Sequence, residues 1–96
     1  MEMLNGTPAA KKHKEDTRMW HEGRIGSPTS NTIYVYWAKV YGEGSEHGID
    51  GGCISKLTIR KLGETSDLYN FDRGLDKDCA NDEVRAVYEI VLAKYN

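Results

Sequence analysis

Hydrophobic and polar residues alternate through much of the chain in a way that predicts four β-strands. The clearest candidate spans residues 32–41, where β-branched and aromatic residues are dense and both faces are apolar, as in a central strand. Further candidates span residues 18–25, 53–62 and 68–72. Because clusters of Gly, Pro, Ser and Asn separate these segments, the four strands are expected to form an antiparallel meander.

A different period marks the end of the sequence, where apolar residues recur every three or four positions across residues 82–95. Asn81 is a suitable N-cap for this helix, and the acidic residues after it favour the positive end of the helix dipole. We therefore predict an α+β fold, with a four-stranded antiparallel sheet and one C-terminal helix packed on one face. Residues 18–96 are expected to form this single domain, and residues 1–17 a flexible N-terminal arm.

A single helix can cover only one face of such a sheet. In the third strand, Leu57 and Ile59 alternate with polar residues, so we assign these two aliphatic side chains to the covered face. The opposite face would remain open as a contact surface for a partner; the alternative is that the N-terminal arm, or a second copy of the chain in a homodimer, covers it. We expect the open face to carry Tyr34, Tyr36, Lys56, Thr58 and Arg60.

The composition restricts the settings in which this domain can work. The 96 residues carry a net charge of −2, contain no apolar run long enough to cross a bilayer, and begin without the apolar core of a signal peptide. We expect a cytoplasmic protein that does not bind membranes. In that compartment Cys53 and Cys79, which have no Cys-x-x-Cys partner, are expected to be free thiols.

Residue patterns typical of catalysis or metal binding are missing from the sequence. His13, His21 and His47 are scattered, and none of them has a cysteine or a second histidine at ligand spacing. The glycine-rich residues 48–52 lack the Gly-Lys-Ser/Thr of a phosphate-binding loop and precede a strand, not a helix. We therefore expect a non-enzymatic protein without a metal or another cofactor.

Two polar segments are candidates for binding a partner. Residues 42–52 form a loop with five glycines, longer than a sheet of this size requires, and residues 72–76 place charges of both signs on a glycine-containing turn. A solvated acidic loop and a turn closed by its own side chains are the structural alternatives. The candidate partner-binding residues are Glu43, Glu46, Asp50, Asp72, Arg73 and Asp76.

From Met19 onward the chain resembles a family of small uncharacterised proteins encoded by phages, plasmids and prophages of Gram-positive (Firmicutes) bacteria. The family has no established activity, so no functional residue is transferred from it. The residues that carry the resemblance are Trp20-His-Glu-Gly23, Lys39-Val-Tyr41, Ser45-Glu-His-Gly-Ile-Asp-Gly-Gly-Cys-Ile-Ser-Lys-Leu57, Tyr69-Asn-Phe-Asp-Arg-Gly-Leu-Asp76 and Lys94-Tyr-Asn96.

The resemblance implies a protein-binding module of a mobile element, and an inhibitor of a host defence system such as a CRISPR nuclease is one form it can take. The partner would be a host or phage protein. Seven acidic residues against two basic ones in residues 64–83 fit a basic partner surface, but an ordinary solvated hairpin and helix start is the more frequent explanation for such a segment. The alternative is a nucleic-acid-binding accessory protein that uses Tyr34, Tyr36, Lys56 and Arg60. Against it, the isoelectric point is about 5.9, whereas nucleic-acid-binding proteins usually carry a basic footprint.

Overall fold

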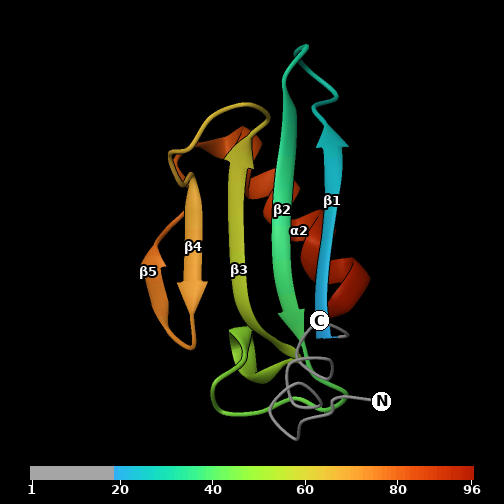
Figure 1. The fold of residues 1–96 in the computed structure, drawn as a ribbon, viewed down its shortest axis with the longest axis vertical. Coiled ribbons are helices and arrows are strands. Elements are labelled where there is room, and N and C mark those ends of the chain that lie inside the picture. Colours follow the sequence, from blue (N-terminus) through green and yellow to red (C-terminus); the bar gives the residue numbers. More distant parts are fainter. Residues whose placement is uncertain (1–18) are drawn as a thin grey trace, which may run out of the picture.

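The computed structural model describes residues 19–96 as one antiparallel sheet of five strands backed by a single helix (Figure 1). The strands follow one another across the sheet in chain order, so the fold is a meander. The prediction of an α+β fold with an antiparallel sheet and a C-terminal helix is confirmed, and the predicted arm lies outside the described residues. The elements are β1 (Trp20–Gly26), β2 (Ile33–Val40), the 3-10 turn η1 (Ile49–Gly51), β3 (Ile54–Lys61), β4 (Tyr69–Asp72), β5 (Leu75–Lys77) and α2 (Asp82–Tyr95).

The prediction of four strands is wrong by one, because residues 75–77 form the edge strand β5. All three side chains of β5 are exposed, so the segment lacks the apolar alternation by which a strand is recognised in a sequence. It pairs with β4 through a register shift between Asn70 and Phe71. Its backbone pairing, not burial of its side chains, makes it a strand.

Helix α2 begins and packs as its sequence predicts. The side chain of Asn81 accepts a hydrogen bond from the backbone N–H of Val84 at 3.0 Å, which satisfies one of the free amides of the first turn. Three valines of the apolar stripe, Val84, Val87 and Val91, are fully buried against the sheet. In Figure 1 the helix lies behind the sheet, so within residues 19–96 no helix covers the front face.

The choice of covered face in β2 is the opposite of the prediction. Tyr34 and Tyr36 lie beneath the helix and are only 1% and 4% exposed, so neither is available on the open face. The strand register explains why: Tyr36 lies directly opposite Ile59, and directly opposed residues project to the same face of a sheet. Space for the ring comes from Gly23 on β1, where an added Cβ would lie 2.6 Å from the Tyr36 hydroxyl.

Both tyrosines are compatible with burial because their hydroxyl groups find partners. The Tyr36 hydroxyl lies 3.0 Å from that of Tyr95 on the helix, and the Tyr34 hydroxyl donates to the carboxylate of Glu83. A buried Tyr ring therefore adds apolar contact area without leaving its polar end unsatisfied. Burial is the main reason that the pKa of each of these two phenols rises to about 12.

One carboxylate joins the β1–β2 turn to the first turn of the helix. Glu83 accepts hydrogen bonds from the hydroxyls of Ser27, Thr29, Ser30 and Tyr34. These bonds, that from Ser27 first, hold the pKa of the Glu83 carboxyl down at about 2, because each donor stabilises the charged form. The cluster fixes the far end of the long β1–β2 hairpin against α2.

A matched pair of leucine substitutions tests where the core lies. Leu57 is fully buried between β3 and α2, whereas Leu75 on β5 is 58% exposed. Leu57→Ala is expected to lower the free energy of unfolding by about 2–5 kcal/mol, and Leu75→Ala to change it by less than about 0.5 kcal/mol. Chemical denaturation monitored by circular dichroism measures both. Equal midpoints for the two variants would contradict the packing of this face.

The Glu83 cluster predicts a specific pH dependence of stability. Because the folded-state pKa of Glu83 lies below its ordinary value of 4.5, its contribution is complete above that pH and is lost as the pH falls toward about 2. Glu83→Gln is therefore expected to be less stable than the wild type at neutral pH, with the difference shrinking across this acidic range. Urea denaturation at a series of pH values measures it. Glu89→Gln, an exposed position on the same helix, is the control and should follow the wild-type profile.

Candidate docking face

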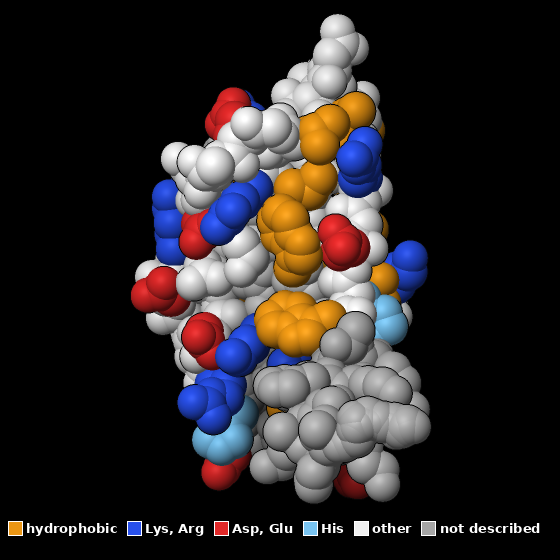
Figure 2. All heavy atoms as spheres, viewed as in Figure 1, with side chains coloured by type: hydrophobic (Ala, Val, Ile, Leu, Met, Phe, Trp, Pro, Cys, Tyr) orange, Lys and Arg blue, Asp and Glu red, His pale blue; other side chains and the backbone are white. Residues whose placement is uncertain are grey.

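The open face of the sheet carries an apolar column along β1 and β2, which we call the aromatic stripe. Alternation along the paired strands places its members on the side away from the helix. Trp20 and Ile33 are each 42% exposed, and Trp37 is half-buried between them. Figure 2 shows these hydrophobic side chains gathered along the sheet, with charged side chains of both signs beside them. The stripe comprises Trp20, Ile33, Val35, Trp37 and Leu62.

Trp37 separates two shallow hollows on this face. One, of about 280 Å³, is lined by Trp20, Trp37, Thr58 and Arg60. The other, of about 350 Å³, extends from β1 across β2 to the β3–β4 turn, and Val35, Trp37 and Leu62 supply its apolar wall. The Trp37 ring can therefore contact a partner, while the two hollows beside it can accept side chains of that partner. Aromatic side chains next to pockets are common at the centres of protein interfaces.

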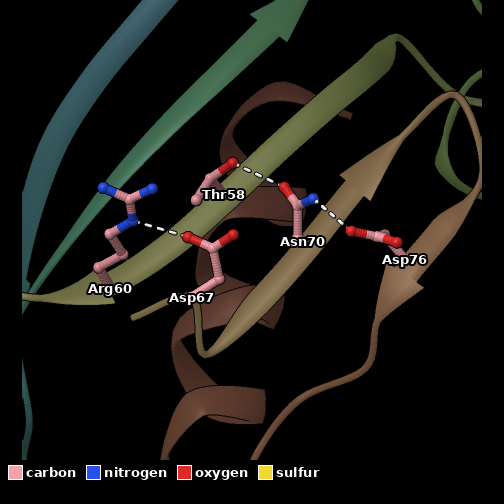
Figure 3. Close-up of polar contacts among 5 residues, drawn as sticks. All are labelled: Thr58, Arg60, Asp67, Asn70 and Asp76. Atoms are coloured by element: carbon pink, nitrogen blue, oxygen red, sulfur yellow. Dashed lines mark hydrogen bonds and ion pairs between the residues drawn. The ribbon is translucent and has the colours of Figure 1, made fainter. Parts of the chain in front are cut away.

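The other half of the open face, over β3, β4 and β5, is a hydrogen-bonded polar ladder (Figure 3). Arg60 Nε donates to Asp67 Oδ1 at 2.7 Å. In the next rung the Thr58 hydroxyl donates to Asn70 Oδ1 at 2.8 Å, and Asn70 Nδ2 donates to Asp76 Oδ2 at 2.9 Å. These side chains hold one another in place, so the half of the face beside the aromatic stripe is ordered and polar.

Two cations of this face, Lys56 and Arg60, are paired with carboxylates from the same sheet. Lys56 Nζ lies 3.7 Å from Asp72 Oδ1, directly across the β3–β4 pair, and Arg60 is bound to Asp67 as described above. The Arg60 guanidinium also lies 5.5 Å from the centre of the Trp37 ring, a cation–π contact that joins the polar ladder to the aromatic stripe. Lys56 and Arg60 thus point where the sequence predicts, but with their charges largely compensated.

The six predicted partner-binding residues do not form one site. Glu43 and Arg73 come together at the edge of a hollow of about 590 Å³ at one end of the sheet, which Tyr41 and His47 also line. Asp72 and Asp76 belong to the open face, through their contacts with Lys56 and Asn70. The charge of Asp50 instead acts on Tyr88 of the helix. The Oε2 atom of Glu46 lies 3.7 Å from Nε2 of the neighbouring His47.

The loop of residues 42–52 has a structural role that its length and composition conceal. Ile49 is 3% exposed and belongs to the core, so the middle of the loop is anchored there. The backbone folds tightly around it: at Gly48 an added Cβ would lie 1.9 Å from the carbonyl oxygen of Gly52. Asn96 fastens the loop, because its side chain accepts from the Ile54 N–H at 2.9 Å and donates to the Ile49 carbonyl at 3.0 Å.

Residues 19–96 contain neither a cluster of metal-ligating side chains nor a candidate membrane-spanning helix. Within residues 19–96, no three His, Cys, Asp or Glu side chains converge as a metal site requires. Cys53 and Cys79 are separate thiols, as predicted. The described part of the chain also contains no helix long and apolar enough to cross a bilayer.

The sequence reasoning missed the aromatic stripe and the role of Asp67 in the polar ladder, whereas Asp76 was among the predicted residues. Both faces of β2 are apolar, so alternation alone does not decide whether its tyrosines or Trp37 lie under the helix. One signal was present: a glycine at position 23 of the neighbouring strand leaves room for a large ring on one face. The pairing of Arg60 with Asp67 depends on the β3–β4 turn geometry and had no signal in the sequence.

Substitution of Asn96 tests whether the loop is anchored as described. Asn96→Ala removes the acceptor of the buried Ile54 N–H and is expected to lower the free energy of unfolding by about 1–3 kcal/mol. Asn96→Asp keeps the acceptor but loses the donor to Ile49, so an intermediate loss is expected. Chemical denaturation measures both, with Asn31→Ala, in the exposed β1–β2 turn, as the control. Identical stabilities for Asn96→Ala and Asn31→Ala would mean that the anchor contributes nothing.

Comparison with known proteins places the described domain in a family. The profile of a family described as "Domain of unknown function (DUF7678)" matches residues 19–96, the same part of the chain that the structure describes. No curated protein and no solved structure matches the chain. The five-stranded meander with its single backing helix is therefore the fold of a member of this family, and the chain belongs to the DUF7678 family.

Proposed function

We propose that the protein is a non-enzymatic protein-binding module that docks a partner protein on the open face of its sheet. The observation that carries the proposal is the aromatic stripe, in which Trp20 and Trp37 lie beside two hollows on a face that the helix leaves uncovered. Exposed tryptophans are costly to keep in water and are enriched among the residues that contribute most to protein interfaces.

The charges around the stripe favour a protein over a nucleic acid. Nucleic-acid binding relies on unpaired cations that neutralise phosphates, and both Arg60 and Lys56 already have carboxylate partners on the same face. The chain as a whole carries a net charge of −2. A partner with apolar side chains at its centre and charges of both signs at its rim fits this surface best.

Asp72 and Asp76, predicted as contact residues, fit the rim of this interface. Asp72 lies 3.7 Å from Lys56 and is well exposed, so a basic side chain of the partner can share its carboxylate. Glu43 and Arg73 lie at the end of the sheet and would contact only a partner that reaches beyond the strands. These assignments are part of the proposal.

Inhibition of a host defence system is the biological role that we associate with this module. Its support is the resemblance to proteins of phages and other mobile elements, together with a surface suited to covering part of another protein. An inhibitor of this kind needs no catalytic group, because occupying the working surface of its target is sufficient.

The test is affinity capture from a lysate of the native host, followed by binding measurements with the purified candidate. Trp20→Ala and Trp37→Ala are each expected to weaken binding by about 30-fold or more, the effect of losing an interface hot spot. Ile90→Ala, an exposed aliphatic position on the outer side of the helix, is the control and should bind like the wild type. Circular dichroism confirms that each variant is folded.

Two results would count against the proposal. Binding that is insensitive to both tryptophans but lost on Ile90→Ala would move the interface to the helix. Sub-micromolar binding of labelled oligonucleotides at about 150 mM salt, abolished by Lys56→Ala with Arg60→Ala, would favour the nucleic-acid alternative. In that case the two tryptophans would serve as stacking platforms for bases.

A further inference from the structure

The two edges of the sheet differ in their capacity to pair with another strand. Strand β5 closes one edge and has only three residues, Leu75–Lys77, the short form in which edge strands usually resist pairing. Strand β1 forms the other edge and runs for seven residues, Trp20–Gly26, without a proline or a bulge (Figure 1). Within residues 19–96 no further strand covers it.

The pattern of hydrogen bonds between β1 and β2 shows which residues of β1 direct their backbone N–H and carbonyl groups away from β2, toward the free edge of the sheet. Ser27 N–H donates to the Thr32 carbonyl at 2.9 Å, which makes these two a hydrogen-bonded pair of the antiparallel β1–β2 ladder. Such pairs alternate with pairs whose backbone groups point away from each other. Counting back along β1, the backbone groups directed to β2 belong to His21, Gly23 and Ile25, and those directed outward belong to Trp20, Glu22, Arg24 and Gly26.

In one register, the charges on the outer edge of β1 are complementary to those on the same edge of a second copy of β1. When β1 pairs antiparallel with a second β1 about a two-fold axis at Gly23, Glu22 of each copy lies directly opposite Arg24 of the other. In this register the outward N–H groups of each strand also lie opposite the outward carbonyl groups of the other, so the backbones can form hydrogen bonds. A shift of the axis to Glu22 or to Arg24 keeps the phase but places like charges opposite each other, which is unfavourable.

From this complementarity we propose that β1 pairs with β1 of a second copy of this chain, so that two sheets become one continuous sheet across a two-fold axis. The occupant of the edge is a second copy because the two-fold axis creates two equivalent ion pairs. On each side of the axis, Glu22 of one copy lies opposite Arg24 of the other. Gly23 stands on the axis, where the close approach of two strands leaves least room. The proposal concerns the edge of the sheet and does not rest on the docking function proposed for its open face, although Glu22 and Arg24 also line the 350 Å³ hollow of that face.

The dimer geometry follows from the symmetry. A two-fold axis perpendicular to the joined sheets keeps both open faces on the same side and both copies of α2 on the other. Each Trp20 then lies opposite Gly26 of the second copy, so the two aromatic stripes flank the same seam. The result is one broad surface with two equivalent halves.

Charge reversal tests the register directly. The wild-type chain is expected to sediment with the mass of two chains, and Glu22→Arg and Arg24→Glu, each of which faces like charges, with the mass of one. An equimolar mixture of these two variants is expected to regain the dimer, because every opposed pair is then Arg with Glu. Analytical ultracentrifugation up to about 200 µM measures all four samples, a range that covers the weak association typical of small interfaces.

Glu89→Arg, an equal change of charge on the exposed side of the helix, is the control and should remain dimeric. A wild-type chain that stays monomeric over the whole range overturns the proposal. So do single variants that remain dimeric, or a mixture of folded variants that fails to associate. The rescue by mixing is specific to this register and would not arise from a general effect of charge.

Hydrogen exchange of the unmodified protein provides a test that does not depend on any variant. The Gly23 and Ile25 amides are directed to β2 and are expected to be protected in every state. The Glu22 and Arg24 amides point outward, so we expect their protection to increase with protein concentration as the dimer forms. Rapid exchange of these two amides at the highest concentration would show that the edge is unpaired and would overturn the proposal.

Discussion

The structure of residues 19–96 depends on one constraint, that its one helix can cover only one of the two faces of the sheet. The β2–β3 register decides which side chains the helix buries, because Ala38 lies opposite Leu57 and Tyr36 opposite Ile59. A slip of one residue would exchange the two faces of β2 and place Trp37 under the helix. The same register that builds the core therefore also determines which aromatic residues remain on the open face.

Most of the fold could be predicted from the sequence. Strands are recognised by the two-residue alternation of apolar side chains, and the helix by its repeat of apolar residues every three or four positions and by its N-cap residue. The helix starts at its expected cap, and each predicted strand is present. What failed was the choice between two apolar faces of β2, which local pattern cannot make. That choice is settled by distant partners: Glu83 and Tyr95 for the tyrosine hydroxyls, and Gly23 for the space a ring occupies. Strand β5 escaped recognition because its pairing involves no burial.

The candidate site was less predictable than the fold. Proximity in sequence grouped Glu43, Glu46 and Asp50 on one loop, but in the structure Glu43 lines the hollow at the end of the sheet, Glu46 lies beside His47 and Asp50 acts on Tyr88. Asp72 and Asp76 lie on the open face, because the β4–β5 hairpin continues it. A surface made of residues from several strands becomes visible only when the pairing of those strands is known.

The glycine-rich loop also bears on how this protein can be engineered. In a sequence, five glycines between two strands look like a flexible spacer in which an epitope or a fluorescent label could be inserted. Here glycine serves the opposite purpose, since backbone atoms pack where a Cβ would otherwise stand at Gly44 and Gly48. An insertion there would separate the end of the sheet from the residues that close it. In the exposed β3–β4 turn, Thr65 and Ser66 are the better attachment point, because they are exposed and line neither hollow of the open face.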